Sequence, residues 1–223
     1  MEMYITSIYQ YPLVFMMESR QQSDEGIGVV KKKFRDRGGI LRFVEARQCG
    51  IAPAMLYRLR DQGVIHNMGR GLYRLADGPP LTQPDLITVA RKIPRAVICL
   101  VSALAFHELT DEVPHVVEFA LPRGTEPPRL DYPPTHLYWF TGQAYSDGIE
   151  THEVDGILVR LYGPEKTIAD CFKYRNKIGM DVALEALRDG WAQRKLTIDA
   201  LWHHAAVNRV ANVMRPYLES VTV

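Results

Sequence analysis

The sequence predicts an α+β protein in two parts: a small N-terminal module of helices and a hairpin, then a mixed α+β domain with a helical C-terminal end. Three observations lead to this prediction. Apolar residues recur at helical spacing up to residue 63, and two short strands then flank a glycine-rich turn. Beyond the Asp-Gly-Pro-Pro break at residues 77–80, short apolar strands alternate with helices. The 223 residues are enough for two domains with buried cores.

The N-terminal module is expected to contain three helices joined by short turns. The second helix would bury an apolar stripe made of Ile40, Phe43 and Val44. Pro53 suits the first turn of the third helix, where its missing N–H costs nothing, and Gly63 is a stop signal. The three helices are predicted at residues 29–37, 40–49 and 52–62.

The third helix can bury one side and expose the other. Leu56 and Leu59 are three residues apart and should both face the core. After this helix, two short strands surround a Gly-Arg-Gly turn centred on Arg70. A winged helix-turn-helix consists of two helices joined by a short turn and followed by a hairpin. Its second helix exposes one face, with which it reads DNA. We therefore expect a DNA-binding domain at residues 29–78.

The charge distribution favours the same interpretation. The formal net charge of the chain is +1, but residues 29–78 carry +7 and the remainder carries −6. A short basic block on an acidic remainder is typical of a module that binds a polyanion. A solvated basic face, or a module that docks to a protein, would have the same composition.

Each predicted DNA contact follows from the chemistry of its side chain. Arg58 is expected to bind guanine in the major groove, and small apolar groups beside it to touch thymine methyls. Tyr57 and Arg60 should hold phosphates, and Arg70 at the hairpin tip should reach the minor groove or a phosphate. A lysine cluster would clamp the backbone. The full predicted set is Lys31, Lys32, Lys33, Ala54, Met55, Tyr57, Arg58, Arg60, Asn67 and Arg70.

Residues 1–28 are expected to form an N-terminal extension. Met16 or Met17 would serve equally as a translation start, and a loosely ordered lead-in explains the same composition. The stretch lacks the basic region and cleavage site of a signal peptide. No apolar run approaches the roughly 18 residues of a membrane span, and the three cysteines are widely spaced. We therefore expect a cytoplasmic protein that does not contact membranes.

A linker near residues 77–82 leads to a second domain expected at residues 83–223. Ser102 is predicted to cap the helix that follows the first strand. Lys166 and Asp170 are four residues apart and are expected to pair on a helix surface, worth about 0.2–0.5 kcal/mol. Strands are predicted at residues 96–101, 116–121, 137–140 and 157–162, with helices at residues 85–92 and from residue 163 to the C-terminal end.

The sequence contains no recognised catalytic motif. The Gly-Ser and Asp-x-Asp residues with which a nucleotidyltransferase holds Mg²⁺ are absent, as are a P-loop and a GxSxG segment. His203 and His204 are adjacent, so on a helix they should diverge by about 100° and make a poor ligand pair. The four acidic residues at 147–155 lack the spacing of a metal-binding loop. We expect no catalysis, no cofactor and no metal.

Several segments resemble the AbiEi family, the antitoxins of bacterial type IV toxin–antitoxin and abortive phage infection systems. The run GIAPAMLYRLRDQG, followed by GRGLY, is similar to the N-terminal domain of that family. In the second domain, a Pro-Glu-Lys-Thr-Ile-Ala-Asp segment is similar to a family motif, with Lys166 in place of arginine. The resemblance covers about residues 30–221 and rests on residues 50–63, 69–73, 102–109, 117–124 and 163–170.

The resemblance implies a regulator that represses its own operon by binding inverted repeats of double-stranded DNA in its own promoter. The second domain would be an antitoxin domain that antagonises a nucleotidyltransferase-like toxin without a stable complex. Glu165, Lys166 and Asp170 occupy the antitoxin motif. Two alternatives stay open: an orphan winged-helix regulator, and a protein-interaction module without a cognate toxin.

Overall fold

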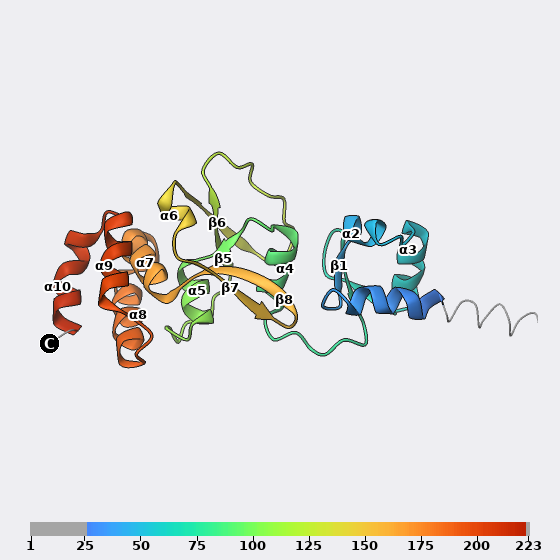
Figure 1. The fold of residues 1–223 in the computed structure, drawn as a ribbon, viewed down its shortest axis with the longest axis horizontal. Coiled ribbons are helices and arrows are strands. Elements are labelled where there is room, and N and C mark those ends of the chain that lie inside the picture. The colour runs from blue at the N-terminus through green and yellow to red at the C-terminus, as the bar shows by residue number, and fades with distance from the viewer. Residues whose placement is uncertain (1–25, 222–223) are drawn as a thin grey trace, which may run out of the picture. The chain divides into compact units, whose positions relative to one another are not determined.

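The computed structural model describes residues 26–221, and most of the expected N-terminal extension lies outside them. The chain divides into two compact units, Met1–Pro80 and Leu81–Val223 (Figure 1). No helix in the described part of the chain combines the length and the apolar character that crossing a membrane requires.

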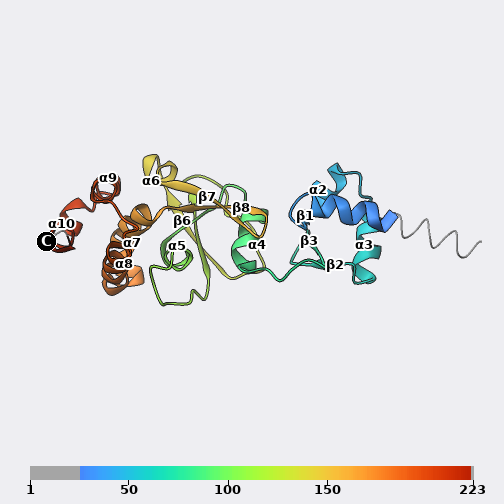
Figure 2. The same cartoon turned by 60° about the horizontal axis from the view of Figure 1, so that its bottom comes forward.

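The described part of the N-terminal unit, from residue 26 on, combines three helices with a three-stranded antiparallel sheet (Figure 2). Strand β3 is central, and it pairs with β1 on one edge and β2 on the other. The elements in chain order are a helix at residues 26–35, β1 (Ile40–Arg42), α2 (Phe43–Gln48), α3 (Pro53–Asp61), β2 (Ile65–Asn67) and β3 (Leu72–Leu75).

The predicted helix over residues 40–49 is wrong at its beginning, because residues 40–42 form strand β1. Ile40 is fully buried and pairs with Arg74 across the sheet. The Glu45 carboxylate accepts a hydrogen bond from the Arg42 backbone N–H at 2.8 Å, so α2 begins only at Phe43. Val44 is 60% exposed and takes no part in the apolar stripe. Residues 40–42 are extended because they pair with β3, and the local sequence pattern gives no information about that partner strand.

The second unit contains a mixed five-stranded sheet in the order β6-β5-β4-β8-β7. Helices α7 to α10 gather at one end of this unit in both views (Figures 1 and 2). The predicted mixed α+β fold with a helical C-terminal end is therefore confirmed. The elements are α4 (Pro84–Lys92), β4 (Val97–Ile98), α5 (Leu100–Phe106), β5 (Val117–Pro122), β6 (Thr135–Phe140), α6 (Gln143–Ser146), β7 (Ile149–Val154), β8 (Ile157–Tyr162), α7 (Pro164–Ile178), α8 (Met180–Ala192), α9 (Ile198–Val207) and α10 (Ala211–Val221).

Ser102 does not cap a helix as predicted, because it lies inside α5, whose N-cap residue is Cys99. The Ser102 side chain is buried and joins the helix to the sheet. Its hydroxyl accepts a hydrogen bond from the Glu118 backbone N–H at 2.9 Å and donates one to the Val116 carbonyl at 3.2 Å. The apolar run that predicted a longer strand also supplies the first turn of α5.

Lys166 and Asp170 do not pair on a helix surface, which corrects the prediction from their spacing. Both side chains are 0% exposed, because the face of α7 that carries them packs against the rest of the unit. Lys166 Nζ donates to both carboxylate oxygens of Asp170 at 2.5 and 2.6 Å, and Asn208 Nδ2 donates to Oδ1 at 2.7 Å. Burial raises the pKa of Asp170, and these donors oppose the rise.

Aromatic rings cover the remaining side of the Lys166 ammonium. Nζ lies 4.3 Å from the centre of the Tyr162 ring and 4.9 Å from that of Phe140. The charge is thus compensated by a carboxylate and by two ring faces. The network joins α7 to β6, β8 and the end of α9.

Removing one partner of this pair should leave an uncompensated buried charge. We expect Lys166→Met to lower the free energy of unfolding by about 3–5 kcal/mol. Tryptophan fluorescence during urea unfolding of the full chain measures this, because Trp139, Trp191 and Trp202 all lie in the second unit. The double change Lys166→Met with Asp170→Leu should recover most of the loss, since no buried charge remains. A single-variant loss below about 1 kcal/mol would contradict a central role for the pair.

His107 should make the stability of this unit depend on pH. Burial lowers its pKa below 6.5, while the Tyr162 carbonyl, which accepts a hydrogen bond from Nε2 at 2.8 Å, opposes the shift. Glu150 also raises the pKa, and His152 and Lys195 lower it. The unfolded chain therefore binds the His107 proton more tightly than the folded chain does. The contribution of neutral His107 to the free energy of unfolding is complete above the pKa of His107 in the unfolded chain, and it is lost as the pH falls below that value.

The measurement is urea unfolding at several pH values between 7.5 and 5 for the wild type and for His107→Gln. The wild type should lose more stability on acidification than the variant, which has no proton to bind at this position. Parallel pH profiles for the two proteins would rule out this contribution of His107.

Candidate nucleic-acid interface

Helix α3 presents one side of the N-terminal unit to solvent. Leu56 and Leu59 are fully buried, as predicted, and fix the helix on the core. On the opposite side Ala54 and Arg58 are exposed, and Tyr57 is 45% exposed. Tyr57 is therefore available for contact and is not a core residue.

The turn before α3 sets the position of its exposed side. Gly50 adopts a φ of +74°, a conformation that a side chain would strain. Ile51 is then buried beneath the turn, and its N–H donates to the Ala46 carbonyl at 2.9 Å. Ala52 is the N-cap residue and Pro53 occupies the first turn, so α2 and α3 are separated only by residues 49–52. This short, buried connection leaves little freedom in how α3 is held.

The two arginines of α3 differ in their partners. Arg60 donates to the Asp61 carboxylate at 2.8 and 2.9 Å and lies 5.3 Å from the centre of the Tyr57 ring. Arg58 donates only to the Met55 sulfur, at 3.0 Å, and among residues 26–221 it has no carboxylate partner. Arg58 is thus the α3 cation whose charge is not neutralised nearby. Met55 is only partly exposed, because its side chain also packs on the core.

The hairpin places Arg70 at its tip. Gly69 and Gly71 on either side have φ values of 120° and 71°, which L side chains rarely adopt. The Asn67 side-chain oxygen accepts a hydrogen bond from the Gly69 N–H at 2.9 Å, so it closes the turn. Arg70 is exposed. Asn67 is exposed as well, and its amide N–H groups can still donate to a ligand while its oxygen holds the turn.

The three predicted lysines do not act as one group. Lys31 Nζ lies 2.9 Å from the Asp77 carboxylate, which Arg35 also contacts at 3.1 Å. The bonded ammonium of Lys31 lowers the pKa of Asp77. Lys32 is exposed, and Lys33 Nζ lies beside the turn at Gly50, 3.8 Å from where a Cβ would stand. The spacing of the three lysines did not predict the contact between Lys31 and Asp77, because Asp77 is 46 residues away from Lys31 in the sequence.

Ion pairs with acidic residues therefore divide the basic side chains of this unit into paired and unpaired ones. Within the described part of the N-terminal unit, three carboxylates hold Lys31, Arg35, Arg42 and Arg60 in ion pairs. The basic side chains without such a pair there are Lys32, Lys33, Arg37, Arg47, Arg58, Arg70 and Arg74.

Glu165, Lys166 and Asp170, which the resemblance assigned to an antitoxin motif, make internal contacts in the second unit. The Glu165 carboxylate accepts hydrogen bonds from the Thr197 N–H at 3.0 Å and hydroxyl at 3.2 Å, at the beginning of α9. Lys166 and Asp170 form the buried pair described above. The motif thus joins α7 to α9.

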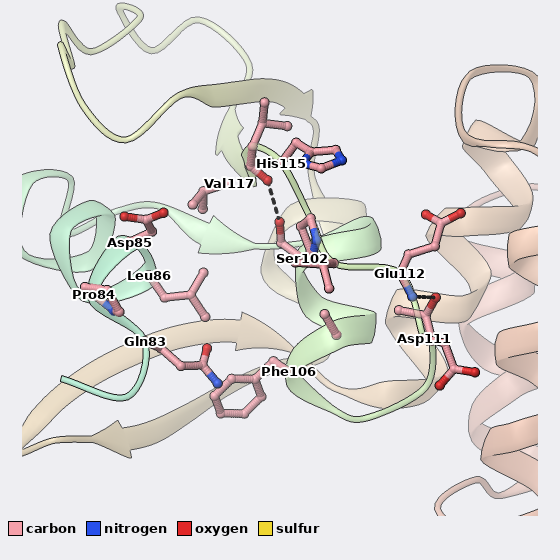
Figure 3. Close-up of a pocket in the computed structure, with 15 residues that line it drawn as sticks. Gln83, Pro84, Asp85, Leu86, Ser102, Phe106, Asp111, Glu112, His115 and Val117 are labelled. Carbon is pink, nitrogen blue, oxygen red and sulfur yellow. Dashed lines mark hydrogen bonds between the residues drawn. The ribbon is translucent and has the colours of Figure 1, made fainter. Parts of the chain in front are cut away.

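A cavity of about 600 Å³ also lies in the second unit, between α4, α5 and the loop before β5 (Figure 3). Leu86 and Phe106 line it with apolar surface, and Asp85, Asp111 and Glu112 give it acidic side chains. No lysine or arginine of residues 26–221 lines it. This lining does not suit a nucleic-acid backbone, which needs cations.

The adjacent histidines of α9 do not diverge as predicted. His203 Nε2 and His204 Nδ1 lie 2.6 and 3.7 Å from the same oxygen of Asp147. They converge because each presents a different ring nitrogen, and the spacing argument considered only the direction of the Cα–Cβ bonds.

The comparisons with known proteins agree with the resemblance in the N-terminal unit. The fold is similar to the crystal structure of the RV2827C protein from Mycobacterium tuberculosis, with a TM-score of 0.56 and 14% identity over 86% of this chain and 78% of that one. At this identity the likeness concerns the fold alone. No match was found among curated proteins. Residues 29–76 match the family model described as "Transcriptional regulator, AbiEi antitoxin".

Proposed function

We propose that residues 29–78 form a winged helix-turn-helix that binds double-stranded DNA with a sequence preference. The single observation that carries the proposal is the exposed side of α3, where Arg58 has no carboxylate partner in the described chain. Such a cation on a helix anchored by Leu56 and Leu59 suits a major-groove contact. The hairpin with Arg70 serves as the wing, and Lys32 and Lys33 contact the backbone.

We further propose that the protein is a regulator and not an enzyme, and that it represses its own operon at inverted repeats. The family description of residues 29–76, which joins transcriptional regulation with antitoxin action, supports this role. Residues 83–223 are the antitoxin domain in this proposal, directed against a nucleotidyltransferase-like toxin. Because Glu165, Lys166 and Asp170 make internal contacts, the motif supports the fold of that domain and does not contact the toxin.

The test is binding of the full chain to the duplex upstream of its own gene, compared with a scrambled duplex, at several salt concentrations. We expect a preference of about a thousandfold or more, and log affinity that falls steeply with log salt. Equal binding to both duplexes would overturn sequence recognition. No binding to either would favour the interaction-module alternative.

Arg58→Ala should reduce the affinity for the specific duplex by about 1–3 kcal/mol, because a bidentate base contact is lost. Binding to the scrambled duplex should change much less. Arg60→Ala is the matched variant on the same helix: because Asp61 already pairs with this cation, its loss should weaken both duplexes alike and only slightly. Arg188→Ala, an exposed change in the second unit, is the neutral control. An undiminished operator affinity for Arg58→Ala would refute the base contact.

Lys32→Ala should weaken specific and scrambled duplexes equally, because a phosphate contact carries no sequence information. The slope of log affinity against log salt should become shallower by about one. Fluorescence anisotropy over a salt series measures both effects. A slope identical to that of the wild type would place Lys32 outside the interface.

A further inference from the structure

We propose that Asp147, His203 and His204 in the second unit bind a divalent transition-metal ion of the zinc class. One ligand atom from each residue lies within 4.8 Å of the other two. The carboxylate comes from the end of α6 and both imidazoles from α9, so a bound ion would join two elements far apart in the sequence. This inference does not depend on DNA binding.

His204 supplies the observation that points to a ligand. The residue is 8% exposed, and its Nδ1 is buried without a hydrogen-bond partner among residues 26–221. The nearest acceptor, Asp147 Oδ2, is 3.7 Å away, which is too far for a hydrogen bond. Buried polar atoms in native proteins are nearly always partnered, and exceptions often mark an ion or a water molecule. A cation between His204 and Asp147 would satisfy this nitrogen.

The distances leave room for a metal after a small adjustment. Zinc binds imidazole nitrogen and carboxylate oxygen at about 2.0–2.2 Å, so neighbouring ligand atoms in a tetrahedral site are about 3.3 Å apart. Asp147 Oδ2 is now 2.6 Å from His203 Nε2 and 3.7 Å from His204 Nδ1. The first distance must lengthen by about 0.7 Å and the second shorten by about 0.4 Å. The Asp147 carboxylate and the exposed His203 ring are the groups that would have to rotate.

The backbone next to the cluster is held closely. Gly148 follows Asp147 with a φ of +70°, and a Cβ there would meet the Lys166 side chain at 2.8 Å and His204 Cε1 at 3.0 Å. The chain therefore passes directly against the His204 ring, and only glycine fits. Such fixed positions favour metal binding, because the ligands need little ordering when the ion enters.

The donor set selects the class of ion. Two imidazole nitrogens and one carboxylate oxygen suit zinc, cobalt, nickel or copper, whereas magnesium and calcium prefer oxygen ligands throughout. The His203 side chain is 57% exposed, so water can reach the cluster and supply a fourth ligand. Three protein ligands with one open position are typical of zinc sites that hold an exchangeable water molecule.

The experiment is a titration of the metal-stripped full chain with Zn²⁺ by calorimetry, together with its thermal unfolding with and without Zn²⁺. We expect one equivalent to bind with micromolar or tighter affinity and to raise the Tm of the second unit. Co²⁺ should bind and give the visible absorption typical of low-coordinate cobalt with nitrogen and oxygen ligands. Mg²⁺ should give no effect at the same concentration.

His203→Ala and Asp147→Asn should weaken Zn²⁺ binding at least tenfold and abolish the rise in Tm. His203 is the safer variant because its side chain is mainly exposed, so the metal-free protein should unfold as the wild type does. His115→Ala, an exposed histidine elsewhere in the same unit, is the matched control and should bind normally. Absence of saturable binding to the wild type, or unchanged binding to both ligand variants, would overturn the proposal.

Discussion

The second unit depends on one buried charge pair. Lys166 and Asp170 are fully buried, and a stable fold requires that every lone pair and proton of the two groups find a partner. Asn208, Tyr162 and Phe140 meet that requirement from three other segments. The positions of α7, α9 and the sheet strands are thus coupled through one set of contacts. Replacing a buried pair by apolar residues of similar volume is often neutral or stabilising, whereas removing one partner alone is strongly destabilising.

The same coupling reaches the proposed metal site. Gly148 packs against Lys166 and His204 at once, so the residue that keeps the ion pair covered also holds the backbone of Asp147 in place. Glu165, next to Lys166, binds the beginning of α9, the helix that carries both histidines. The segment at residues 163–170 is therefore an organising element of this unit, and its polar residues are explained by contacts inside the protein.

In the N-terminal unit, ion pairs with carboxylates determine which basic side chains stay available for a ligand. The excess of basic residues is visible in the sequence, but it does not say which cations stay available. Asp77 and Asp61 engage Lys31, Arg35 and Arg60, and leave Arg58 and Arg70 without carboxylate partners in the described chain. Since a neutralised cation gains less from a phosphate than an unpaired one, this sorting defines the surface that the proposal assigns to DNA.

The sequence by itself determined the fold class, the buried side of α3 at Leu56 and Leu59, the Gly-Arg-Gly hairpin and the likeness of residues 29–76 to the AbiEi family model. These features rest on local periodicity, turn chemistry and short motifs. Only the tertiary structure decided that residues 40–42 form a strand, that Lys166 and Asp170 are buried, and that His203 and His204 converge on Asp147. Each of these depends on a partner distant in the sequence, and spacing along one element carries no information about what packs against it.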